Sequence, residues 1–126
     1  MLFIYKDEVL EIHRKLITRF GGARGIRDDG MLESALLAAP NRHYYEQASL
    51  AVCAATYAFH LASNRPFVSG NKATAAAVSE AFLGLNDASL TATNDELVEL
   101  FERIEADAAS REEVELALEK WTAPGE

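Results

Sequence analysis

The sequence predicts an all-α fold, a compact bundle of about six helices around one buried central helix. Three observations lead to this prediction. The chain has 126 residues, a length that fits one domain over residues 1–126 with one hydrophobic core. Its apolar residues recur at the three- and four-residue spacing of amphipathic helices. Proline and glycine are sparse, so long irregular segments are not expected.

The amino-terminal third contains two predicted helices. Residues 2–5 form either a short strand or a packed terminus, and the first helix covers about 7–20 before two glycines stop it. Asp28 is a good N-cap for the second helix. Pro40 is predicted to end that helix, because an internal proline removes a backbone hydrogen bond. Residues 41–46 then form a polar and aromatic connector.

The middle of the chain supplies the predicted core. Residues 47–63 are apolar nearly all round, the pattern of a helix buried on most sides. Cys53 lies in this run and is predicted to be a buried structural thiol. The loop 65–70 opens into an alanine-rich helix over 71–83.

The carboxyl-terminal third contains two more predicted helices. They begin at Thr93 and Ser110, each followed three residues later by a glutamate in a capping box. Residues 90–92 are candidates for an extended segment, and no convincing sheet is predicted.

The charge pattern restricts the classes of partner. The net charge is −8 and the acidic residues gather late, in residues 94–119. An acidic face repels phosphate backbones, so direct nucleic-acid binding is not expected. The face is either a solvated surface or a contact for a basic protein. No run reaches the length of a membrane span and no secretory signal is visible, so we expect a cytoplasmic protein without membrane contact.

A candidate anion site lies where the loop 65–70 meets the next helix. Gly70 can adopt backbone angles that are closed to other residues. The free N–H groups and the dipole of a helix start attract anions. Asn71 and Lys72 add an amide and an ammonium group to that first turn. On physical grounds alone, the same residues also suit an ordinary helix start.

A longer pattern surrounds this loop. Residues 64–75 read Asn-Arg-Pro-Phe-Val-Ser-Gly-Asn-Lys-Ala-Thr-Ala. They resemble the signature of the Fic/Doc family, whose usual form is His-Pro-Phe-x-Asp/Glu-Gly-Asn-Lys/Gly-Arg. The flanking segments 19–22, 25–28, 32–36, 57–62 and 81–86 resemble the Doc-type branch in the same order.

The resemblance implies a compact helical domain and a nucleotide-dependent transferase that uses ATP and magnesium. Many members transfer AMP to a protein hydroxyl, whereas Doc-type toxins phosphorylate elongation factor Tu and are paired with an antitoxin. In the family the motif histidine is the general base and the motif acid holds magnesium. The backbone, the asparagine, the lysine and the arginine bind phosphates.

This chain departs from the signature at three positions. Arg65 replaces the histidine, and an arginine cannot accept a proton. Ser69 replaces the acid and is a poor magnesium ligand, so no metal site is expected. Ala73 replaces the phosphate-binding arginine. The signature residues that remain are Pro66, Phe67, Gly70, Asn71 and Lys72.

These departures suggest an altered anion site. The site gains about one positive charge, so Arg65 and Lys72 are predicted to hold an anion without magnesium, with Arg65 as a solvated loop residue the alternative. The predicted contacts of a partner beside the loop are Arg24, Arg27 and the pair Tyr44-Tyr45. The histidines His13, His43 and His60 are interpreted as structural.

Three functions remain open. The first is a catalytically impaired Doc-like protein that binds an antitoxin-like partner, elongation factor Tu or a nucleotide. The second is an active transferase toxin with a shifted mechanism, or a variant inactivated deliberately. The third is an assembly or regulatory module that keeps only the fold.

Overall fold

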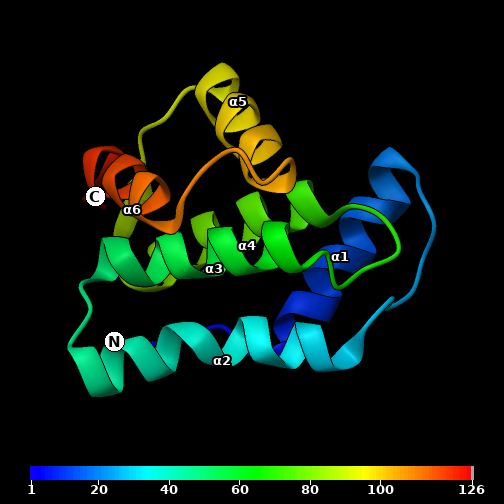
Figure 1. Cartoon of the computed structure of the whole chain (residues 1–126), viewed down its shortest axis with the longest axis horizontal. Coiled ribbons are helices and arrows are strands. Elements are labelled where there is room, and N and C mark those ends of the chain that lie inside the picture. Colours follow the sequence, from blue (N-terminus) through cyan, green and yellow to red (C-terminus); the bar gives the residue numbers. More distant parts are fainter. Residues whose placement is uncertain (126) are drawn as a thin grey trace.

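Six α-helices and one small sheet make up the computed structural model, which describes residues 1–125 (Figure 1). The helices are α1 (Lys6–Phe20), α2 (Asp29–Glu46), α3 (Leu50–Asn64), α4 (Asn71–Leu85), α5 (Asn94–Glu105) and α6 (Arg111–Trp121). The strands are β1 (Ala88–Leu90) and β2 (Thr122–Pro124). The predicted all-α class is confirmed.

The central position belongs to α3, as the sequence predicts. It lies between α2 on one side and α4, α5 and α6 on the others (Figure 1). Its buried residues include four alanines, which let neighbouring helices approach closely. Cys53 is buried there as predicted, and burial raises the pKa of its thiol to about 11, so it stays protonated at neutral pH.

The prediction that Pro40 ends the second helix is wrong. Pro40 lies inside α2, which continues through the predicted connector to Glu46 and ends at Gln47 in the left-handed conformation. The packing of α2 outweighs the backbone hydrogen bond that Pro40 removes. Before the proline Leu36 and Ala39 are buried, and after it His43 Nδ1 lies 3.1 Å from the carbonyl oxygen of Ala48.

The prediction that the chain has no convincing sheet is also wrong, because the structure contains a small two-stranded one. β1 and β2 pair antiparallel, with Ser89 opposite Ala123, and tie the end of the described chain to the turn after α4. Three-residue strands are too short to leave a recognisable period in the sequence. Residues 2–5 form a packed terminus, the other alternative left open above, and no strand.

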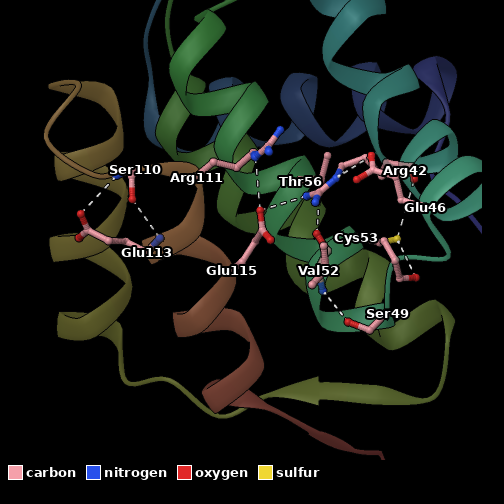
Figure 2. A network of polar contacts seen from close by, with 12 residues as sticks. Arg42, Glu46, Ser49, Val52, Cys53, Thr56, Ser110, Arg111, Glu113 and Glu115 are labelled. Carbon is pink, nitrogen blue, oxygen red and sulfur yellow. Dashed lines mark hydrogen bonds and ion pairs between the residues drawn. The ribbon is translucent and has the colours of Figure 1, made fainter.

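Polar contacts attach α6 to the rest of the bundle (Figure 2). Arg42 on α2 donates from Nη1 to Glu115 Oε2 at 3.0 Å and to Thr56 Oγ1 at 3.2 Å. Arg111 Nε lies 3.5 Å from the same Glu115 oxygen. Because Arg42 and Glu115 are less than a fifth exposed, this pair is screened less than a surface ion pair.

No helix within residues 1–125 combines the length and the apolar character that a bilayer crossing requires.

A buried tyrosine anchors the amino-terminal segment, and its loss should be measurable. Tyr57 Oη accepts from Ile4 N at 3.0 Å and donates to Ile4 O at 2.9 Å. Tyr57→Phe leaves both backbone groups unpaired in the core. We expect the free energy of unfolding, measured by urea denaturation, to fall by about 1–3 kcal/mol. Tyr45→Phe is the control, because Tyr45 is exposed; an equal loss in both variants would contradict this assignment.

Candidate functional site

The candidate site is the loop 65–70, held between the end of α3 and the start of α4. Arg65 is exposed and takes the left-handed conformation, with φ 47°, as the residue that ends α3. Arg27 donates from Nε to the Arg65 carbonyl at 2.7 Å and from Nη2 to the Asn64 carbonyl at 2.8 Å. The Arg27 side chain therefore satisfies two carbonyls at the helix end.

The segment 21–28 runs along the loop and is bonded to it through the backbone. The Pro66 carbonyl accepts from the N–H groups of Arg27 and Asp28, at 2.7 and 3.0 Å. Val68 N–H donates to the Gly25 carbonyl at 3.1 Å, and Ile26 and Phe67 form an isolated antiparallel bridge. The loop thus gains a strand-like neighbour on one edge.

Ser69 bonds the same two segments with its side chain. Its Oγ accepts from Ala23 N at 2.8 Å and donates to Ala23 O at 3.0 Å. Gly22 lies so close that an added Cβ would stand 2.6 Å from Ser69 Oγ, and its φ of +118° also favours glycine. Ser69 therefore carries a hydroxyl that is already committed to the backbone.

Asn71 and Phe67 shape the inner side of the loop. The Asn71 amide accepts from Phe67 N at 2.9 Å and donates to Phe67 O at 3.0 Å. The Phe67 ring is buried and stacks on His13 with ring centroids 3.8 Å apart. His13 Nε2 lies 2.9 Å from the Ser69 carbonyl, which only accepts, so Nε2 carries the proton.

A hollow of about 440 Å³ opens over this loop. Lys72 and Glu105 both line it and form an ion pair, with Nζ and Oε1 3.6 Å apart. Glu105 is the last residue of α5 and the one carboxylate among the lining residues of this hollow within 1–125. The remaining lining residues are Arg65, Val68, Ser69, Gly70, Asn71 and Ala73.

The donor set of the hollow does not fit a resident magnesium ion. Magnesium prefers several oxygen ligands with at least one free carboxylate. Here Ser69 is bonded to Ala23 and Glu105 is paired with Lys72. Within residues 1–125, no three histidine, cysteine, aspartate or glutamate side chains gather in a way that could hold a metal ion.

A larger groove of about 780 Å³ continues from this hollow between α1, α4 and α5. Lys72 and Ala73 line both spaces, so the groove and the hollow adjoin at the first turn of α4. The groove is largely apolar, and Phe20 on its rim is exposed over 71% of its surface. Its other apolar lining residues are Leu16, Ala76, Ala77, Leu97, Val98 and Phe101.

The structure separates the predicted contact residues into two groups. Arg24 and Arg27 lie on the segment beside the loop. Tyr44 and Tyr45 lie at the opposite end of α2 from the loop, so they are not part of this site (Figure 1). His43 and His60 are also outside the lining of the hollow. Burial lowers the pKa of His60, with the positive charges of Arg111 and Arg42 adding to the effect.

The interpretation of His13 as a structural residue agrees with its contacts, because its ring packs on Phe67 and bonds to the Ser69 carbonyl. Sequence reasoning missed one participant of the hollow. Glu105 lies more than thirty residues after Lys72, and no local pattern in the sequence connects them.

Comparison with protein-family models finds a match over more than half of the chain. The family model described as Fic/DOC family matches residues 3–83, which include α1, α2, α3 and the loop 65–70 and end within α4. The acidic segment 94–119 lies outside the matched residues. No curated protein matches the chain.

The bond between Ser69 and Ala23 can be tested directly. Ser69→Ala removes two hydrogen bonds at a partly exposed place, so we expect a loss of about 1 kcal/mol in the free energy of unfolding. The amide of Ala23 should also exchange faster in hydrogen-exchange NMR. Ser89→Ala, at an exposed position on β1, is the control. Unchanged exchange at Ala23 would show that the backbone pairing alone holds the segment.

Proposed function

Because the chain belongs to the Fic/DOC family, we propose that it is a Doc-like toxin-type protein of a bacterial toxin–antitoxin pair that acts in the cytoplasm by binding. In this proposal the transferase chemistry of the family is impaired at Arg65, Ser69 and Ala73.

The Ser69 contact carries the proposal. A side chain that accepts from Ala23 N and donates to Ala23 O has a structural role in the loop, where the family has its metal-binding acid. Serine is also a weak ligand for magnesium compared with a carboxylate. The substitution therefore replaces a catalytic group with one that stabilises the loop.

The position of the general base supports the same proposal. The guanidinium of Arg65 has no acceptor atom, so it cannot take a proton from a target hydroxyl. His13 Nε2 is engaged with the Ser69 carbonyl, and His60 does not line the hollow. Loss of general-base catalysis typically slows a reaction by about 10²–10⁴-fold.

Anion binding is the property that the loop retains. Gly70 has φ 80° and is the N-cap of α4, so the N–H groups of the first turn face the hollow that Arg65 and Lys72 line. The Asn71 amide is already bonded to Phe67 and contributes mainly to loop shape. We propose that a nucleotide phosphate is held here without magnesium and without transfer.

A second candidate function is an active transferase with a shifted mechanism, and Glu105 is the observation that favours it. Its carboxylate enters the hollow beside Lys72, where it can accept a proton. In this alternative Glu105 takes over the role of the missing base.

The groove between α1, α4 and α5 is the proposed binding place of an antitoxin-like segment. Its apolar floor and its exposed Phe20 suit the apolar side of a partner peptide. The rim carries Arg19, Lys72, Glu80 and Glu102, so the partner should bear charges of both signs. Elongation factor Tu is the proposed target, bound without modification.

Restoring the signature tests the catalytic part of the proposal. The native chain and the triple variant Arg65→His, Ser69→Asp, Ala73→Arg are incubated with ATP, magnesium and purified elongation factor Tu, and the target is read by intact mass. We expect phosphate addition by the triple variant alone. Addition by neither protein would exclude this target or this chemistry.

Addition by the native chain would favour the second candidate, and Glu105→Gln then tests it. This variant keeps the size of the side chain and removes the base, so the native activity should fall by about 10²-fold or more. The exposed Glu99→Gln on the same helix should leave it unchanged.

Partner binding in the groove is tested by introducing a charged side chain among its lining residues. With an antitoxin-like protein as the probe, Val98→Glu should weaken the complex at least about tenfold in calorimetry, because a carboxylate would be buried against apolar surface. Leu116→Glu, at an exposed position on α6, is the control. Equal affinity of the Val98 variant and the native chain would exclude the groove.

A further inference from the structure

The outer side of α2 carries large apolar side chains that neither the core nor the loop uses. Leu37, Tyr44 and Tyr45 are exposed over 56%, 83% and 82% of their surfaces. The inner side of the same helix is formed by Leu32, Ala35, Leu36 and Ala39, all buried. A helix that is apolar on both sides is normally covered on both.

The outer residues form a regular seam. Gly30, Ser34, Leu37, Asn41 and Tyr44 follow one another at alternating intervals of four and three residues, and all five are exposed. This is the spacing with which one helix packs along another. The seam is also graded in size, with glycine and serine in its first half and leucine and tyrosine in its second.

The distribution of charge favours another copy of this chain as the occupant. Residues 94–119 contain ten carboxylates and two arginines, which accounts for the whole net charge of −8. In Figure 1, α5 and α6 lie on the far side of α3 from α2. The five seam residues carry no charge, so two copies can meet along α2 with little repulsion.

We propose that two copies of this chain associate through the outer face of α2, with the two helices antiparallel around a twofold axis. Ser34 then lies opposite Tyr44 of the second copy, and Leu37 lies opposite Asn41 of the second copy. Each large side chain meets a smaller or polar one, and the twofold axis repeats each contact. A parallel pairing would instead place tyrosine against tyrosine and glycine against glycine.

The charges beside the seam are compatible with this pairing. Asp29 and Glu33 form ion pairs with Lys6, and Glu46 forms one with Arg42. Antiparallel helices also align their dipoles favourably. Because α2 begins at the end of the molecule that carries the loop 65–70, the two loops lie at opposite ends of the pair and stay open (Figure 1).

The proposed contact between the two copies of α2 is short, so we expect a weak association. The seam from Ser34 to Tyr44 is about 15 Å long, at about 1.5 Å per residue. Stable complexes bury at least about 1,200 Å² of surface, and one helix pair of this length buries less. We therefore expect a dissociation constant on the order of 10 µM.

Sedimentation equilibrium tests the association. It is measured from about 1 to 500 µM, a range that brackets this dissociation constant. The average mass should rise with concentration towards twice the 13.8 kDa of one chain. Leu37→Glu changes an exposed position, so the circular dichroism spectrum should show an unchanged fold. The variant should raise the dissociation constant at least tenfold, about the effect of one buried charge. Leu116→Glu on α6 is the matched control and should leave it unchanged. A single-chain mass throughout, or equal effects of both variants, would overturn the proposal.

Cysteine cross-linking tests the orientation. In the double variant Ser34→Cys, Tyr44→Cys the two thiols of one chain are about 15 Å apart along the helix, too far for an internal disulfide. Mild oxidation should therefore yield a covalent dimer, whereas Ser34→Cys alone should remain a single chain. A covalent dimer of the single variant would indicate the parallel pairing and overturn the proposed one. Cys53 is buried and does not compete.

Discussion

The burial of α3 is the constraint on which the rest of this structure depends. This helix is apolar nearly all round, and eight of its fifteen residues are buried. Such a helix is stable only when other helices cover it on most sides. Because α2 and α4 flank it, the two connections 21–28 and 65–70 meet at the same end of the bundle (Figure 1). The candidate site therefore follows from how the core is closed.

At that end, backbone hydrogen bonds hold the loop against the segment 21–28. Arg27 and Ser69 bond the two connections from opposite directions, while Asn71 and His13 fix Phe67 between them. Every polar group used in this way is unavailable for substrate chemistry, since a hydrogen-bonding group has a limited number of partners. The loop 65–70 thus has a backbone shape fixed by these contacts, and Arg65 and Lys72 bring positive charge to the hollow above it.

The carboxyl-terminal helices add a second layer to the matched family core. Residues 94–119 account for the whole net charge of the chain, and α6 is joined to α2 by a pair of partly buried residues, Arg42 and Glu115 (Figure 2). The same layer brings Glu105 to Lys72 and forms one wall of the groove. The properties of the candidate site are therefore set jointly by the family core and by a segment outside the match.

The sequence by itself determined the all-α class, the central helix, the two capping boxes and the position of the signature loop, because each depends on a local pattern or on periodicity. It failed at Pro40, where packing on both sides of the proline keeps α2 helical, and at the strands, which are too short to leave a period. Only the tertiary structure decided that Glu105 enters the hollow, that Ser69 is bonded to Ala23, and that Tyr44 and Tyr45 lie away from the loop. These are contacts between residues distant in the chain, and their free energies depend on packing that no local window of sequence contains.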